Sequence, residues 1–167
     1  MAKAFPLDLL SGDGTVVPAT AHVSTTPIPG SIWRDFTVRV AWAGGEAVGT
    51  GCDAFYALRA ARAQLDPVGL LPRCYGACRN FVMSGMGSQM GGGGAGHLVT
   101  LGHPAGAATA MTFEAGPDMD VVSVAAQDAF KEAWLTSLGL SPNPARLQTP
   151  PHGSLLGWLK SLVRRRG

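Results

Sequence analysis

The sequence contains few charged residues and lacks a long hydrophobic run. Charged side chains make up only 14% of the 167 residues, whereas 46% of the residues are hydrophobic. This composition excludes disorder over most of the chain and supplies ample material for a core. The formal net charge is only +2, so we expect no nucleic-acid-binding surface. Because no stretch of about twenty apolar residues occurs, we also expect no transmembrane helix.

Cysteine is scarce as well. The chain has three, Cys52, Cys74 and Cys78, and an odd, small number does not make the disulfide framework of a secreted domain. Residues 1–10 have too short an apolar part for the core of a signal peptide, and Pro6 interrupts it. These features predict a cytoplasmic protein.

Glycine, with 23 residues, and proline, with 12, are by contrast abundant, which predicts short elements joined by many turns. The clearest strand is 35–43, in which Phe36, Val38, Val40 and Trp42 share one face. The other expected strands cover residues 5–10, 15–24, 46–48, 97–101 and 108–114, together with 70–82 as a long strand or a bent hairpin arm.

Two helices are expected between and after these strands. Asp53 is a good N-cap for a helix over residues 54–65. Residues 120–138 form the second, with Phe130 and Trp134 on its buried face. The order of strands, helix, strands, helix predicts an α+β fold. We expect a mixed or antiparallel sheet of about five to six strands, with two main helices packed on one face.

The composition changes after the second helix and predicts three parts. Residues 1–139 form the α+β domain, and residues 140–153, rich in proline, form a linker. Residues 154–167 form a basic amphipathic tail, predicted as a helix that docks on its own domain or a second copy, on a protein partner or on a membrane surface. The apolar side of this tail includes Trp158, Leu159 and Leu162.

A glycine-rich run at residues 84–96 stands out from this background. It has seven glycines and joins two predicted strands, so we expect a mobile hairpin loop. Met83, Met86 and Met90 lie in or beside it. Flexible thioether side chains suit an adaptable apolar contact surface, which predicts that these methionines contact a protein partner.

The alternative is that the run binds an anion. The amides of Gly91, Gly92 and Gly93 would form a nest, and Arg79 would add a positive charge. However, a Walker A loop requires Lys and then Ser or Thr after the last glycine, and a dinucleotide-binding loop requires a helix. Residues 95–97 are Ala, Gly and His and begin a predicted strand, so both fingerprints fail.

No complete catalytic or metal-binding pattern is present. Cys74 and Cys78, with His97 and His103, provide enough donors for zinc but lack a clear second knuckle, and two buried thiols are the commoner arrangement. Ser84 lacks the Gly-x-Ser-x-Gly pattern of a serine nucleophile. We therefore expect no catalytic residue, no metal and no cofactor.

Five short segments carry a resemblance to known proteins: Asp53–Arg59, Tyr75–Ala77, Asn80, Ser84–Met86 and Met90–Gly91. Together they resemble small bacterial proteins, some of which are companions or immunity-type partners of larger proteins. The resemblance covers about residues 50–135. It implies a small cytoplasmic binding protein and transfers no catalytic residue.

The leading expectation is a non-enzymatic protein-binding module of the immunity, adaptor or accessory type, with a homo-oligomer as a further expectation. The second is an enzyme that binds a small molecule or nucleotide through the glycine-rich run. The third is a membrane-surface protein anchored by its tail.

Overall fold

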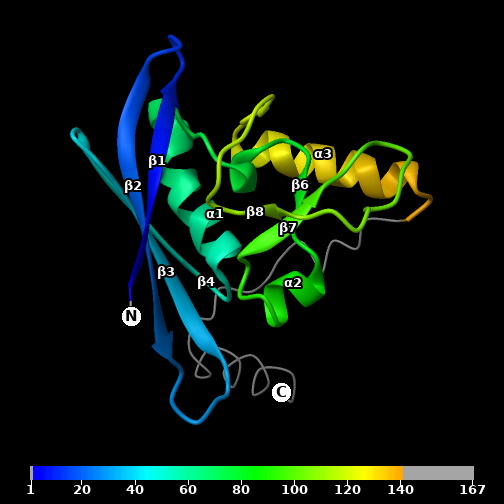
Figure 1. Ribbon diagram of the computed structural model, residues 1–167, viewed down its shortest axis with the longest axis horizontal. Coiled ribbons are helices and arrows are strands. Elements are labelled where there is room, and N and C mark those ends of the chain that lie inside the picture. The colour runs from blue at the N-terminus through cyan, green and yellow to red at the C-terminus, as the bar shows by residue number, and fades with distance from the viewer. Residues whose placement is uncertain (1, 141–167) are drawn as a thin grey trace, which may run out of the picture.

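A curled, five-stranded antiparallel sheet forms the larger part of the protein (Figure 1). The computed structural model describes residues 2–140. The strand order is β4-β3-β2-β1-β5, and helix α1 covers one face. The strands are β1 (Lys3–Ser11), β2 (Val16–Pro27), β3 (Arg34–Trp42), β4 (Gly45–Gly51) and β5 (Leu70–Pro72), and α1 spans Ala54–Leu65.

Helix α1 forms where the sequence predicts it, and it lies very close to the sheet. The Asp53 side chain accepts a hydrogen bond from the Tyr56 amide at 2.7 Å and so caps the first turn. The side of α1 that faces β4 carries small residues, and β4 presents Gly49, where an added Cβ would overlap the backbone of Ala57 and Ala61. Small residues on both elements therefore allow helix and sheet to approach.

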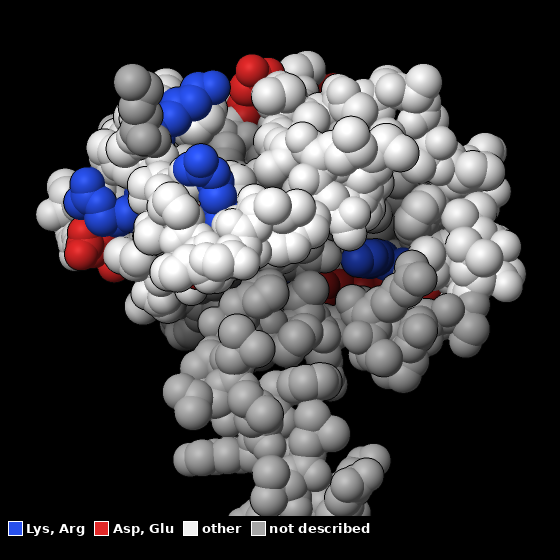
Figure 2. Space-filling view, turned by 90° about the horizontal axis from the view of Figure 1, so that it is seen from below, with Lys and Arg blue, Asp and Glu red and all other residues white. Residues whose placement is uncertain are grey.

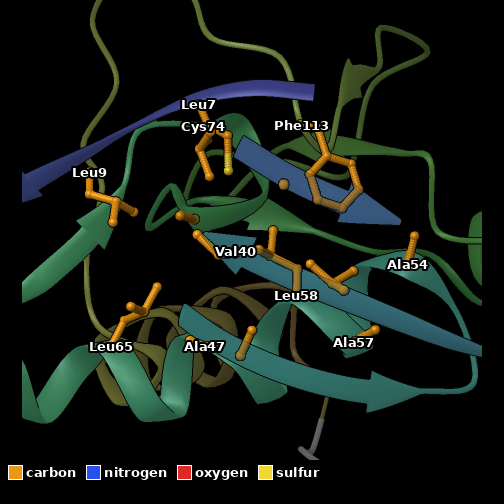
Figure 3. Close-up of a cluster of buried hydrophobic side chains, with 14 residues drawn as sticks. Leu7, Leu9, Val40, Ala47, Ala54, Ala57, Leu58, Leu65, Cys74 and Phe113 are labelled. Atoms are coloured by element: carbon orange, nitrogen blue, oxygen red, sulfur yellow. The ribbon is translucent and has the colours of Figure 1, made fainter. Parts of the chain in front are cut away.

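The main core lies between this face of the sheet and α1 (Figure 3). Alternation along β1 and β3 turns Leu7, Leu9, Val38 and Val40 inward, where they are buried. Leu58 of α1 is fully buried against the same cluster. Strands with alternating apolar residues and an amphipathic helix, both visible in the sequence, thus produce this half of the fold.

The remaining elements are short and irregular. The second sheet has three strands in the order β6-β7-β8, namely Phe81–Val82, Ala95–Leu98 and Ala110–Met111. Two 3-10 helices, η1 (Asp66–Val68) and η2 (Tyr75–Ala77), and the helices α2 (Gly85–Gln89) and α3 (Val124–Ser137) complete the described residues.

The α+β class is confirmed, but the arrangement differs from the expectation of one sheet with two helices on one face. The large sheet has five strands and the short strands form a second sheet. Of the helices within residues 2–140, α1 covers the large sheet, whereas α3 packs through Trp134 against Val82 and Val99. Helix α3 also begins at Val124, capped by Ser123, rather than at residue 120.

The long strand or bent hairpin arm predicted over residues 70–82 is a strand only at its two ends. Its residues form β5, the 3-10 turn η2 and β6. Gly76 is the reason, because its amide donates to Thr112 O at 2.9 Å, and a Cβ there would lie 2.7 Å from the Thr112 methyl group. The expected strands 97–101 and 108–114 are likewise reduced to Ala95–Leu98 and Ala110–Met111. The apolar residues within 70–82 did not indicate that this segment turns at Gly76 inside the core.

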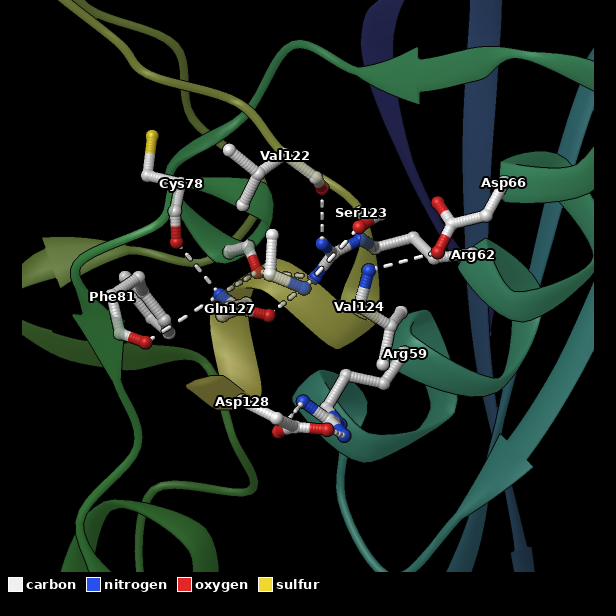
Figure 4. Close-up of polar contacts among 12 residues, drawn as sticks. Arg59, Arg62, Asp66, Cys78, Phe81, Val122, Ser123, Val124, Gln127 and Asp128 are labelled. Atoms are coloured by element: carbon white, nitrogen blue, oxygen red, sulfur yellow. Dashed lines mark hydrogen bonds and ion pairs between the residues drawn. The ribbon is translucent and has the colours of Figure 1, made fainter. Parts of the chain in front are cut away.

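A buried polar network joins α1, η2 and α3 (Figure 4). The fully buried Arg62 donates to Gly76 O at 3.1 Å, to Gln127 Oε1 at 2.6 Å and to Val122 O at 2.7 Å. Gln127 in turn donates to Cys78 O at 2.8 Å. Burial lowers the pKa of Arg62 to about 10, so the guanidinium stays charged at neutral pH and its charge is shared among carbonyl oxygens.

Among the described residues, no helix is long and apolar enough to cross a membrane. The predicted tail and all but the first residue of the predicted linker lie outside the described residues.

Candidate binding cleft

A cleft of about 570 Å³ lies between the β2–β3 loop and helix α2. Both elements lie at the lower end of the molecule in Figure 1. Seen from below, in Figure 2, the described surface is largely uncharged, with Lys and Arg side chains gathered mainly to one side. The residues that line the cleft are Ile28, Ile32, Trp33, Arg34, Asp35, Phe36, Cys52, Tyr56, Met83, Ser84, Gly85, Ser88, Gln89, Met90 and Gly92.

The first wall is the β2–β3 loop. Its turn is held by the hydrogen bonds from Ile28 N to Trp33 O at 3.3 Å and from Trp33 N to Ser31 Oγ at 3.0 Å. Gly30 has φ +73°, a conformation that glycine adopts without strain. This turn leaves Ile32 and Trp33 exposed at 90% and 53%. The loop therefore presents two large apolar side chains at the entrance of the cleft.

The second wall comes from the glycine-rich run, which is not a simple hairpin loop. Ser84 caps α2 by accepting from the Gly87 amide at 3.0 Å. Exposed Met86 and Met90, at 72% and 84%, project from this helix and its end. Met83 is instead buried, at 7%, and forms part of the cleft lining. Of the three predicted contact methionines, two are thus available at the surface.

The floor of the cleft lies at the junction between β4 and α1. Cys52 and Tyr56 line it, and Ser88 reaches it from α2. The Ser88 hydroxyl donates a hydrogen bond to the buried carboxylate of Asp53, the residue that caps α1. This bond ties α2 to the start of α1 and therefore sets the position of the second wall.

Close packing explains why several residues of the run are glycine. Gly92 and Gly93 have φ values of +58° and +71°, which strain any residue with a Cβ. A Cβ on Gly93 would also lie 2.7 Å from the carboxyl carbon of Asp53 and from the Phe55 amide nitrogen. The consecutive glycines thus allow the chain to turn directly against the start of α1.

Two of the three amides of the predicted anion nest, those of Gly91 and Gly93, are bonded within the chain. The amides of Gly91 and Gly93 both donate to Gly87 O at 3.1 Å, and the Gly94 amide donates to Gly91 O at 3.1 Å. Arg79 pairs with Asp120 at 2.6 Å and does not line the cleft. The structure therefore does not bring the predicted anion-binding residues together into one site.

The amino-terminal end of α1 is also used by the protein itself. The Ala54 amide donates to Gly92 O at 2.9 Å, and the Tyr56 amide donates to the Asp53 carboxylate. A helix N-terminus binds an anion through amides that are otherwise unpaired. Here the chain's own carboxylate takes the place that a phosphate would take.

Cys52 supplies the thiol at the floor of the cleft. Burial, and then the neighbouring Asp53 carboxylate, raise the pKa of Cys52. A reactive cysteine requires a lowered pKa, usually from a nearby cation. The described residues that line the cleft include no histidine, and His97 contacts Ala108 O. Within residues 2–140, no three His, Cys, Asp or Glu side chains gather in a metal-binding group.

The sequence missed one wall of the cleft. Ile32 and Trp33 follow Gly30-Ser31 in a Pro-Gly-rich connection, and two large apolar residues in such a loop are the signal that points to them. The sequence could not predict that Cys52 and Tyr56 line the cleft, because the packing of α2 beside them creates this part of it. The predicted residues Trp158, Leu159 and Leu162 lie outside the described residues.

No protein-family model matches the chain, and no curated protein sequence matches it. The assignment of a function therefore depends on the cleft and on the sequence pattern alone.

Proposed function

We propose that this protein is a non-enzymatic binding module of the immunity, adaptor or accessory type, and that its cleft takes an apolar segment of a protein partner. One observation carries the proposal. Three large apolar side chains, Ile32, Trp33 and Met90, are exposed and line one hollow from two sides. Met86, also exposed, projects from α2 outside the lining.

Exposed apolar side chains scattered singly need no explanation, but a group of them around a hollow marks a contact surface. Tryptophan is enriched among the residues that dominate binding energy. Methionine adapts its shape to different apolar partners. The rigid aromatic side chain of Trp33 on one wall and the flexible thioether of Met90 on the other fit a partner side chain inserted between the walls.

The polar groups around the cleft support binding rather than catalysis. Ser84 caps a helix and Ser88 bonds to Asp53, so both hydroxyls have structural partners. The raised pKa of Cys52 disfavours its thiolate. A nucleophile needs an adjacent base to activate it, and the lining residues supply no such pair. The free thiols of all three cysteines are consistent with a reducing, cytoplasmic location.

In-cell photocrosslinking tests the proposal directly. A benzophenone amino acid at position 90 lies on the cleft wall, and the same group at position 68 is the control, because Val68 is also exposed, at 63%, but does not line the cleft. We expect a protein adduct from position 90 that Trp33→Ser reduces, and none from position 68. Equal adducts from both positions would contradict the proposal.

The second candidate is a small-molecule site in the same cleft. Its volume of about 570 Å³ lies in the usual range for ligand pockets, and Arg34, Asp35 and Tyr56 supply polar groups. A thermal-shift screen of metabolites separates the two candidates. A ligand whose stabilising effect is lost in a Tyr56→Phe variant favours the small-molecule site, and it would remove the need for a protein partner.

Membrane attachment through the tail remains a third proposal, motivated by the basic and apolar residues of 154–167. Flotation with anionic vesicles tests it, since binding that depends on anionic lipid is expected only if the tail contacts the membrane. Homo-oligomerisation is tested by sedimentation of the full chain.

A further inference from the structure

The cleft is open at the surface, and its entrance is apolar on both sides. Ile32 and Met90 are almost fully exposed, at 90% and 84%, although they belong to different elements that line the same hollow. Covering such side chains with another apolar surface is favourable, by about 25 cal/mol for each Å² removed from water. The structure therefore contains an apolar surface that no other segment of residues 2–140 covers.

The chain itself provides a segment of the matching chemistry. The positions of Leu155, Trp158, Leu159 and Leu162 follow the pattern i, i+3, i+4 and i+7, the spacing that places side chains on one face of a helix. Such a short helix is marginal alone in water. Docking in an apolar groove is a common way for an amphipathic segment of this kind to gain stable structure.

The length of chain between the two surfaces is sufficient. The last described residue is Leu140, and residues 141–153 precede the amphipathic segment. At about 3.3 Å per residue, thirteen residues span up to about 43 Å. A domain of this size has a radius of gyration of about 14 Å, hence a diameter of about 37 Å. A path over the surface of such a sphere to its far side is about 58 Å, so the linker reaches every point of the domain except those nearly opposite its start.

Tethering also makes weak docking effective. A short linker gives an effective concentration on the order of 1 mM. Docking with an intrinsic Kd of about 100 µM then makes the docked state about ten times more populated than the undocked state.

Asp35 lines the cleft and has no ion pair among the described residues. The tail carries Lys160 beside its apolar face, which supplies a charge of the opposite sign.

We propose that the C-terminal segment 154–163 docks in cis in the cleft between the β2–β3 loop and α2, as an internal occupant that a partner must displace. The inference rests on the proposed role of the cleft as a binding surface. It names the chemistry of the occupant, a short amphipathic helix with Leu and Trp at one-turn spacing. It also makes the tail a competitor that lowers the apparent affinity for any partner.

The test is fluorine NMR of the full chain labelled with fluorotryptophan. The Trp158→Phe spectrum assigns the Trp158 resonance, and a synthetic peptide of residues 150–167 gives its undocked position. We expect the wild-type resonance to differ from that of the peptide. Met90→Asp and Ile32→Asp, at exposed positions that folding does not need, should move it to the peptide position, whereas Val68→Asp should leave it unchanged.

Three results would overturn the proposal. The wild-type resonance already coincides with that of the peptide, or Met90→Asp does not move it, or the resonance moves toward the peptide position when the protein is diluted, which identifies a second copy as the source of the tail. Crosslinking from position 90 keeps the two proposals separate. If a partner is captured but the tail is not docked, the proposed binding function stands and the docking of the tail is contradicted. If the tail is docked but no partner is captured, the docking stands and the proposed binding function is contradicted.

Discussion

The sheet half of the molecule and the glycine-rich half are stabilised by different kinds of contact. In residues 2–65, inward-facing Val38 and Val40 pack on Leu58 of α1. In residues 69–140, the strands have only two to four residues. There the buried Arg62 side chain donates to the carbonyl groups of Gly76 in η2 and of Val122 before α3. The regular spacing of apolar residues along the chain therefore specifies the first half. The fold of the second half depends instead on individual residues that make contacts far along the sequence.

The largest expected effect comes from removing the buried guanidinium. Arg62→Ala leaves Val122 O and Gln127 Oε1 without their donors and opens a cavity. Each buried unsatisfied group costs about 1–3 kcal/mol, so we expect a loss of about 3–5 kcal/mol in the free energy of unfolding, measured with urea. Arg59→Ala is the matched control. It breaks a partly exposed ion pair with Asp128 and should cost about 1 kcal/mol or less.

The next effect concerns the turn against α1. Gly93→Ala introduces a Cβ at φ +71°, 2.7 Å from Asp53 and Phe55 atoms. Strain and overpacking together should cost about 2–4 kcal/mol. The neighbouring Gly94→Ala places its Cβ 3.3 Å from one carbonyl oxygen without a positive φ and should cost about 1 kcal/mol or less. If both variants lowered the melting temperature equally, the positive φ and close packing of Gly93 would not be what the fold requires.

A smaller effect is expected at the bond that positions the second wall. Ser88→Ala removes the hydroxyl that bonds to the Asp53 carboxylate and should lower the free energy of unfolding by about 1–2 kcal/mol. Amide hydrogen exchange should rise in residues 85–94 and stay unchanged in β3. Faster exchange across the large sheet would instead mean that the two halves unfold as one unit.

The smallest change is chemical and leaves stability unaffected. Burial raises the pKa of Cys74 to about 12 and that of Cys78 to about 11, while the pKa of the half-buried Cys52 is also raised. Only the thiolate reacts, so its fraction near pH 8 is small for all three thiols. Mass spectrometry after brief alkylation should find slow modification of Cys52 alone, increasing with pH, and of all three in urea. Rapid modification of Cys52 would indicate an activated thiol and would revive an enzymatic role.

The sequence predicts the first half well because its rules are local. The alternation in 35–43 and the N-cap Asp53 correspond to β3 and α1 within two residues. The second half was predicted less well. Nothing in the run 70–82 indicates that Gly76 packs on Thr112, because this contact joins residues distant in the sequence. Of the predicted contact methionines, Met83 lies in the core through its packing with Phe81, a fact that no sequence period encodes.

Crosslinking from both walls of the cleft tests the central claim most directly. Benzophenone groups at positions 33 and 90 lie on different elements that enclose one hollow, and position 68 lies outside it. If the cleft binds a protein segment, positions 33 and 90 capture the same partner protein and position 68 does not. Different proteins from positions 33 and 90, or one protein from all three positions, would contradict the assignment of the cleft as a binding site.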